Sequence, residues 1–290
     1  MTETITSAQN PKIKQLLALQ EKARLRRETG LFIVEGHREL QHCIDAGFEI
    51  DTLFICHDIL SGVNSEPVGP AGACRPRRGS GWVELALKGT KAFEISKEIY
   101  QKVAYREGTE GIIAEVRARE RRLEDLELKE NPLVVVLESV EKPGNLGAVL
   151  RSADAAGADA VLICDPLTDL YNPNLIRASI GAIFTVPCAT CSSEEAISWL
   201  KDHNVQILTA QLQDSEWYYD TDMKHGTAIV IGTEATGLTR AWRDAADAHI
   251  KIPMLGTLDS LNASVSAAIL LFEAVRQREC AGRSGKPVDL

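Results

Sequence analysis

From residue 133 onward, short and almost continuously apolar segments alternate with segments of helical length. LVVVLESV, AVLIC, VQILTAQL and TAIVIG carry Val, Ile, Leu or Ala at most positions rather than at every second one. Strands of this composition are buried on both faces, as in parallel sheets that helices cover on each side. The alternation therefore predicts an α/β domain with a parallel sheet over residues 133–290.

A smaller α/β domain is expected over residues 1–116. Two apolar segments, LFIVEG (31–36) and IDTLFIC (50–56), lie on either side of a helix-favouring stretch. A strand–helix–strand unit of this kind predicts a small parallel sheet. We expect a helix over KAFEISKEIYQKVA (91–104) and a closing strand in EGIIAEV (110–116).

Two segments lack the pattern of a core element. Residues 61–81 are rich in Gly, Pro and Ser and show no periodicity, which predicts a mobile surface loop. Residues 117–132 are highly charged and end in Asn-Pro, which indicates a partly helical linker between the two domains.

Composition favours a cytosolic protein. No apolar run approaches the roughly 18 residues that span a bilayer, and the N-terminus lacks the apolar core of a signal peptide. Of the seven cysteines, only Cys188 and Cys191 lie close together, without a second pair at zinc-finger spacing. We therefore expect reduced cysteines, no metal ion and no membrane partner.

The net charge of −9 is unevenly distributed. Residues 1–122 carry 19 Lys and Arg against 17 Asp and Glu, whereas residues 123–290 carry 13 against 24. The basic runs KARLRR (22–27) and RPRR (75–78) can bind RNA locally, because phosphate contacts act over short distances in physiological salt. On charge alone, solvated helix and loop side chains explain these runs equally well.

Three loops that follow predicted strands contain the glycine and polar residues of a candidate site. They span residues 141–151, 232–238 and 252–264. In open α/β sheets, ligands bind beyond the carboxyl ends of the strands. None of the three loops has the G-x-G-x-x-G or Walker pattern of the common nucleotide-binding loops.

The first of these loops opens a predicted helix in EKPGNLGAVLRSADAAG. Asn145 is placed to cap the helix, and Arg151 shares a helical face with Gly144 and Ala148. This face has little bulk, so a ligand can approach the backbone. Tight packing against another helix, with Arg151 paired to Asp154, is the alternative that spacing alone leaves open.

The other two loops carry further polar groups. In IGTEATGL, Gly232 and Gly237 flank Glu234, whose carboxylate can accept hydrogen bonds from a base or ribose, or pair with the arginine of the first loop. An exposed turn carboxylate is the alternative. In IPMLGTLDSLNAS, Ser260 and Asn262 are candidate caps of the last helix, although capping explains only part of the polar cluster.

Together the three loops resemble the SpoU/TrmH family of RNA 2′-O-methyltransferases, within the SPOUT class, over about residues 133–278. Residues 7–116 also resemble the family's substrate-binding domain, a ribosomal-protein-like α/β fold. The resemblance implies a deep trefoil knot in the C-terminal domain, which strand patterning cannot show. It also implies that the knot's loops bind S-adenosylmethionine (AdoMet) and form a homodimer.

The resemblance further implies which residues form the site. The catalytic set, carried over motif by motif, is Arg151, Asn145, Glu234, Ser260 and Asn262. The AdoMet-binding set is Thr209, Ala210, Gly232, Ile252, Met254 and Leu261.

The arginine of the first loop is the family's proposed general base, but a guanidinium stays protonated in proteins. We expect Arg151 mainly to stabilise the developing alkoxide and to hold the adjacent phosphate. Asn145, Glu234 and Asn262 would orient the guanidinium and the ribose.

The expected activity is AdoMet-dependent methylation of a ribose 2′-hydroxyl in RNA. Large-subunit ribosomal RNA is favoured because of the ribosomal-protein-like domain, with transfer RNA as the alternative. A non-catalytic RNA-binding or ribosome-assembly factor on the same fold is a further alternative. The intact catalytic set argues against it, because such a factor would not need these residues. A dinucleotide-dependent oxidoreductase is disfavoured because the glycine fingerprint and the acidic residue that binds ribose are missing.

Overall fold

The computed structural model describes residues 3–63, 90–105, 110–233, 236–258 and 260–282. Its contacts divide the chain into two compact units. One comprises Met1–Arg119 and Leu170–Phe184, and the other comprises Glu120–Asp169 and Thr185–Leu290. A segment inside the predicted 133–290 domain thus packs with the N-terminal unit.

The C-terminal unit is built on a seven-stranded sheet in the order β10-β12-β9-β11-β6-β7-β8. Every strand pairs in parallel with its neighbours, as the sequence predicted. The strands are β6 (Leu133–Glu138), β7 (Ala160–Cys164), β8 (Cys188–Cys191), β9 (Gln206–Ala210), β10 (Glu216–Trp217), β11 (Thr227–Ile231) and β12 (Ala248–Lys251).

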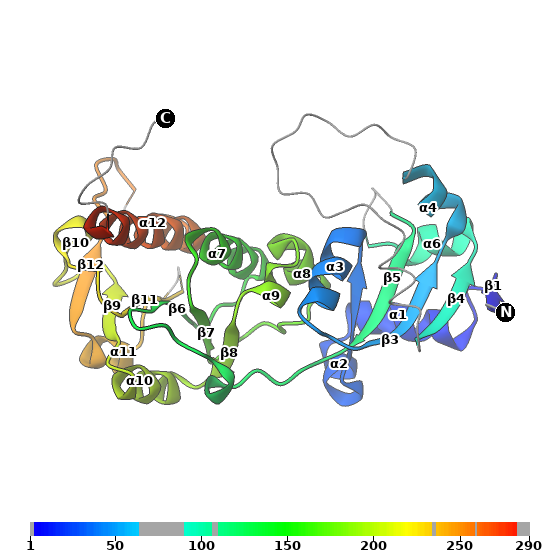
Figure 1. Cartoon of the computed structure of the whole chain (residues 1–290), viewed down its shortest axis with the longest axis horizontal. Helices are drawn as coiled ribbons and strands as arrows, with labels where there is room; N and C mark the ends of the chain where they lie inside the picture. Colours follow the sequence, from blue (N-terminus) through cyan, green and yellow to red (C-terminus); the bar gives the residue numbers. More distant parts are fainter. Residues whose placement is uncertain (1–2, 64–89, 106–109, 234–235, 259, 283–290) are drawn as a thin grey trace. The chain divides into compact units, whose positions relative to one another are not determined.

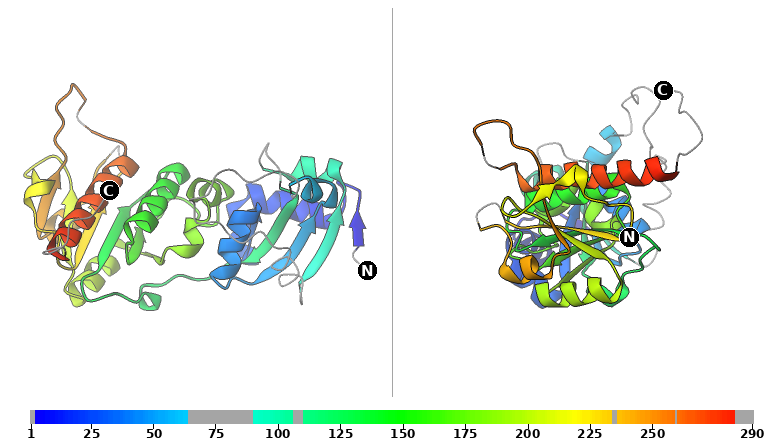
Figure 2. Two further views of the ribbon diagram at one scale, coloured as in Figure 1. Left: turned by 45° about the horizontal axis from the view of Figure 1, so that its top comes forward. Right: turned by 90° about the vertical axis from the view of Figure 1, so that its left-hand side faces the viewer.

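Helices cover both faces of this sheet (Figure 1). Helices α7 (Pro143–Ala156) and α12 (Ala263–Gly282) lie side by side on one face, as two views show (Figures 1 and 2). Helices α10 (Ser193–Asp202) and α11 (Arg240–Ala245) cover the other face, where Trp242 is fully buried in the core. This three-layer arrangement leaves the carboxyl edge of the sheet to the loops. The knot implied by the resemblance stays a prediction.

The N-terminal unit contains a five-stranded sheet in the order β1-β4-β3-β5-β2. The prediction of a small parallel sheet holds only in part: β4 pairs in parallel with β1 and β3, whereas β5 pairs antiparallel with both β2 and β3. Since β2 and β3 are both antiparallel to β5, they do run in the same direction, and β5 lies between them. The strands are β1 (Glu3–Ile5), β2 (Leu31–Glu35), β3 (Ile50–Ile55), β4 (Lys91–Ile95) and β5 (Ile112–Arg117).

Apolar helix faces pack on both sides of this sheet. Helices α1 and α6 contribute to the core on one side. On the other side, Phe32 stacks on Tyr171 with ring centroids 4.2 Å apart and lies 5.9 Å from the ring of Phe184. The helices of this unit are α1 (Pro11–Glu21), α2 (Ala23–Thr29), α3 (His37–Asp45), α4 (His57–Val63), α6 (Lys97–Val103) and α8 (Pro173–Ser179), with α9 (Ala182–Thr185) at its boundary.

Several predicted elements differ from the structure. The helix expected over 91–104 is strand β4 followed by α6, because Ser96 caps α6 by accepting a hydrogen bond from Ile99 N at 3.4 Å. The linker 117–132 contains a single 3-10 turn, Leu123–Asp125. Of the loop predicted over 61–81, residues 61–63 end α4 and the rest lies outside the described residues.

The C-x-x-C segment forms strand β8 rather than a helix start. Among the described residues, no His, Cys, Asp or Glu cluster could hold a metal ion. In the same part of the chain, every helix is too short or too polar to cross a bilayer.

One buried carboxyl group makes the stability of the N-terminal unit sensitive to pH. Glu115 of β5 is 4% exposed, and its Oε1 has no hydrogen-bond partner in the described part of the chain. Burial, with the nearby Asp51, raises the pKa of Glu115 from its ordinary 4.5 to about 7, although Lys12 opposes the shift. The folded state therefore holds this proton more tightly than the unfolded state.

The free energy of unfolding is therefore expected to fall as the pH rises from about 4.5 to about 7. Over this range the Glu115 carboxyl group is ionised in the unfolded chain but still protonated in the folded protein. In a Glu115→Gln variant this decline disappears, because the amide stays neutral. Urea unfolding of both proteins at pH 5 and pH 8 measures the difference. Parallel pH profiles would contradict the prediction.

Candidate active site

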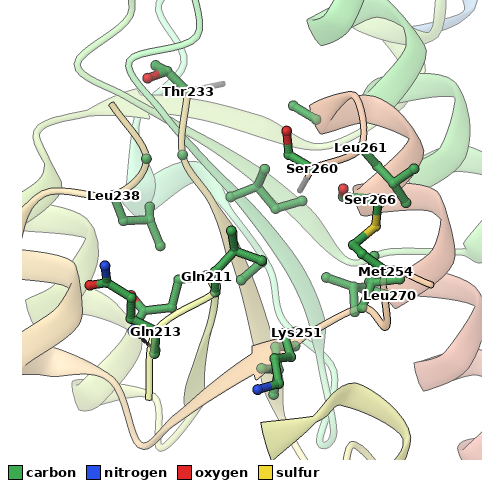
Figure 3. Close-up of a pocket in the computed structure, with 18 of the residues that line it drawn as sticks. Gln211, Gln213, Thr233, Leu238, Lys251, Met254, Ser260, Leu261, Ser266 and Leu270 are labelled. Carbon is green, nitrogen blue, oxygen red and sulfur yellow. Dashed lines mark hydrogen bonds between the residues drawn. The ribbon is translucent and has the colours of Figure 1, made fainter. Parts of the chain in front are cut away.

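A pocket of about 310 Å³ opens where β9, β11 and β12 end. Residues that directly follow each of these strands line it, together with the first residues of α12. Figure 3 shows Leu238, Gln211 and Gln213 on one side of the pocket and Met254, Leu261 and Ser266 on the other. The pocket thus lies at the strand ends where the sequence placed its second and third candidate loops.

Two glycines shape the wall that follows β11. A Cβ on Gly232 would lie 2.5 Å from the carbonyl carbon and oxygen of Gly237, so the chain closes on itself there. The N–H of Gly237 donates to Thr233 O at 2.9 Å, and Gly237 has φ +67°, a conformation that favours glycine. Neither glycine has a side chain, so their backbone lines the pocket directly.

A hydrogen bond joins the first and third candidate loops across 117 positions of sequence. Asn262 Nδ2 donates to Asn145 Oδ1 at 3.1 Å. Asn262 also caps α12, because its Oδ1 accepts from Ser264 N at 3.0 Å. The expected cap of α7 is wrong: Lys142 is the N-cap residue, and Asn145 lies inside the first turn, where it contacts α12.

Arg151 lies on the exposed side of α7. Gly144 and Arg151 are exposed and Ala148 is half-buried, and a Cβ on Gly144 would meet nothing within 4 Å, so no other helix of the described chain packs tightly at Gly144. Within the described part of the molecule, no hydrogen bond or ion pair joins Arg151 to Asp154. The guanidinium is therefore available to a ligand, although Arg151 is not part of the pocket wall.

The structure brings most of the predicted site residues to this pocket. Ala210, Gly232, Ile252, Met254 and Leu261 line it, as does Ser260. Thr209 does not, because its fully buried hydroxyl lies 2.6 Å from His249 Nδ1. Glu234 lies outside the described residues.

Sequence reasoning missed several polar residues of the pocket wall, among them Gln211, Lys251 and Ser266. Gln211 Oε1 is buried and, within the described residues, has no hydrogen-bond partner. Gln211 directly follows β9, so the rule that ligands bind at the carboxyl ends of strands could have found it. Gln211 therefore joins a pocket-lining position to an acceptor that lacks a partner.

Comparison with known proteins identifies the family. A family model described as the SpoU rRNA Methylase family matches residues 132–272, and the MRM3-like substrate binding domain matches residues 10–114. The 23S rRNA (guanosine-2′-O-)-methyltransferase RlmB of Haemophilus influenzae is 36% identical over 202 residues, which are 67% of this chain and 82% of the relative. The chain belongs to the SpoU rRNA methylase family.

Solved structures agree over nearly the whole chain. An RNA 2′-O ribose methyltransferase is 37% identical, with a TM-score of 0.77, and the match covers 95% of this chain and 99% of the other. The AdoMet-bound rRNA methyltransferase of Sinorhizobium meliloti is 28% identical, with a TM-score of 0.81, and covers 95% of this chain and 98% of the other. The resemblance inferred from the three loops is confirmed, and the family is AdoMet-dependent.

The pocket of this chain fits AdoMet. Its volume of about 310 Å³ lies at the lower end of the roughly 300–1,000 Å³ typical of small-molecule sites, and its lining is mostly apolar with a few polar groups. The adenosine amino group, the ribose hydroxyls and the ammonium group of AdoMet are hydrogen-bond donors. Gln211 Oε1 is a buried acceptor on the wall that needs such a donor.

Proposed function

We propose that this SpoU family member transfers a methyl group from AdoMet to the 2′-hydroxyl of a ribose in large-subunit ribosomal RNA. The observation that carries the proposal is the pocket at the ends of β9, β11 and β12, whose walls come from two of the three family motifs. The ribosomal RNA target is supported by relatives named as 23S rRNA 2′-O-methyltransferases. This substrate is consistent with the cytoplasmic location expected from the sequence.

AdoMet, when bound, supplies an electrophilic methyl group on a sulfonium centre. The chain's own contribution is to position the acceptor hydroxyl and to stabilise the negative charge that develops on its oxygen as the hydroxyl proton leaves to solvent water. Arg151 does both in this proposal, because a guanidinium can donate two hydrogen bonds side by side to phosphate or alkoxide oxygens. The hydrogen bond from Asn262 to Asn145 fixes the first turn of α7, the helix that carries Arg151.

We also propose a homodimer formed through the C-terminal unit. Exposed apolar residues, which we call the apolar strip, lie in the loop after β12 and on α12. Its members are Leu255 (97% exposed), Leu258 (74%), Leu261 (36%), Val265 (47%) and Phe272 (48%). Large exposed apolar surface marks interaction sites in soluble proteins, and one member of the strip, Leu261, lines the pocket. A second copy of the chain is the occupant that the family resemblance implies.

The Phe272→Glu variant is expected to weaken dimerisation by at least about 100-fold, because a buried, unpaired carboxylate costs several kcal/mol at an interface. Leu167→Glu is the matched control, since Leu167 is 67% exposed and lies outside the strip. Sedimentation equilibrium of the three proteins measures the dissociation constant. Equal dimerisation of wild type and Phe272→Glu would contradict the proposed interface.

The proposed activity is tested by transfer of labelled methyl from AdoMet to total RNA, separated into ribosomal and transfer RNA fractions. We expect label in large-subunit ribosomal RNA, as 2′-O-methylribose after nuclease digestion. Label confined to transfer RNA would move the target to that class. No label in either fraction, with a folded protein that binds RNA, would favour a non-catalytic assembly factor.

A further inference from the structure

Helix α11 begins in an unusual way. Thr239 is its N-cap residue, yet the hydroxyl of Thr239 makes no capping bond to the helix. A threonine at this position normally accepts a hydrogen bond from an N–H of the first turn. Here its hydroxyl instead donates to Glu138 Oε1 at 2.7 Å, and its backbone N–H donates to Glu138 Oε2 at 2.8 Å. Both oxygens of the Glu138 carboxylate therefore bind Thr239, which lies 101 positions later in the chain.

Glu138 is in turn held in place by buried surroundings. It is the last residue of β6 and is 2% exposed. The hydroxyl of Ser193 lies 3.3 Å from Glu138 Oε1, but its single hydrogen is directed to Asp165 Oδ2 at the shorter distance of 2.7 Å. Trp242 Nε1 donates to the same hydroxyl at 3.0 Å. The firm bonds of Glu138 are thus the two from Thr239, and both are charge-assisted.

Thr239 directly follows the segment that forms one wall of the pocket. Gly237 and Leu238 line the pocket immediately before it, and Gly232 and Thr233 line it where the segment leaves β11. Strand pairing holds the end at β11. At the other end, Leu238 is buried in the core and the next residue, Thr239, is bound by Glu138. Loss of the two bonds to Glu138 would free the backbone of Thr239 and let Gly237, which lines the pocket, move.

We infer that Glu138 is a positioning residue, whose carboxylate clamps Thr239 and thereby holds Gly237 and Leu238 in the positions in which they line the cofactor pocket. This inference rests on the proposed AdoMet-dependent function. It assigns a role in that function to a residue that does not line the pocket. The competing explanation is that Glu138 only stabilises the packing of α10 and α11. The two explanations differ in what happens to AdoMet affinity.

The test uses three variants and a matched control. Glu138→Ala removes both bonds, Thr239→Val removes only the one from the hydroxyl, and Thr239→Ser keeps both. Asp159→Asn is the control, because Asp159 is also buried and its carboxylate accepts from Leu133 N, at the opposite end of the same strand, at 2.8 Å. For each protein, calorimetry gives the AdoMet Kd, thermal unfolding gives Tm, and NMR-detected hydrogen exchange without ligand gives the protection of the Gly237 amide.

We expect Kd to rise about tenfold in Thr239→Val and up to about 100-fold in Glu138→Ala, by analogy with the range found for residues that orient the ligands of a metal ion. Thr239→Ser should restore the wild-type Kd. Exchange of the Gly237 amide should be faster in Glu138→Ala and Thr239→Val only. Asp159→Asn should lower Tm and leave both the Kd and the exchange rate unchanged.

Wild-type affinity and wild-type exchange in Thr239→Val and Glu138→Ala would overturn the inference. So would an equal loss of affinity in Asp159→Asn at the same loss of Tm, since that result would mean a general effect of stability. Should the wild-type protein bind no AdoMet, the proposed function fails. In that case, unchanged Gly237 exchange in Glu138→Ala still rejects the clamp, and faster exchange still supports it.

Discussion

Replacing Arg151 with lysine is expected to lower the rate of methyl transfer by about 100–1,000-fold, the cost of removing one preorganised donor to a developing oxyanion. The AdoMet Kd should stay within about twofold of the wild-type value, because Arg151 is not part of the pocket wall. Lysine keeps the charge but loses the planar fork that binds two oxygens at once. The effect should therefore fall on kcat and spare cofactor binding.

The measurement is single-turnover methyl transfer to ribosomal RNA, with the AdoMet Kd determined by calorimetry on the same preparations. Arg240→Lys is the control, because Arg240 is exposed on α11 and its ion pair is with its helix neighbour Asp244. Near-normal turnover of Arg151→Lys with normal RNA binding would exclude the bidentate clamp. Equal losses in the Arg151 and Arg240 variants would indicate a general dependence on surface charge.

Local sequence patterns predicted the C-terminal sheet because each strand carries its own signal. A segment such as LVVVLE is apolar at almost every position, and only burial on both faces explains it. A second rule, that ligands bind beyond the carboxyl ends of parallel strands, pointed to the region of the pocket, since the pocket walls directly follow β9, β11 and β12. Position at the strand ends pointed to the loops that contain Gly232 and Ile252, and the family resemblance then named these residues as AdoMet-binding.

Pairings between distant segments were not predictable in this way. Strand β5 lies between β2 and β3, yet nothing in their composition states which strand is the neighbour. The bond from Asn262 to Asn145 spans 117 positions, and the bonds from Thr239 to Glu138 span 101. Each of these polar residues also fits a local role, such as a cap or a turn, so a local pattern cannot separate the two uses.

Sequence patterns also could not predict which part of the protein the segment 170–184 packs against. Its residues follow the helical pattern of the C-terminal half, but Tyr171 and Phe184 pack on Phe32 in the N-terminal unit. Hydrophobic patterning shows that a face is buried, without showing which partner buries it. Family resemblance supplied the pattern of the site residues, whereas the network around Glu138 required the structure.

The Gly232→Ala variant is expected to weaken AdoMet binding by at least about 100-fold. Its Cβ would lie 2.5 Å from backbone atoms of Gly237 and 2.7 Å from Leu238 N, and backbone cannot rotate away as a side chain can. The turn must therefore open, which displaces the wall that Gly232, Gly237 and Leu238 form. The loss should appear in cofactor binding itself, before any chemical step.

Gly256→Ala is the matched control for this variant. Gly256 lies in the loop after β12, and a Cβ there would meet nothing within 4 Å. Calorimetric titration with AdoMet should give the wild-type Kd for Gly256→Ala and a greatly raised Kd for Gly232→Ala, with both proteins folded by circular dichroism. If Gly232→Ala bound AdoMet as tightly as wild type, the tight turn after β11 could not be the wall that holds the cofactor. The pocket would then have to be defined by the residues after β9 and β12 alone.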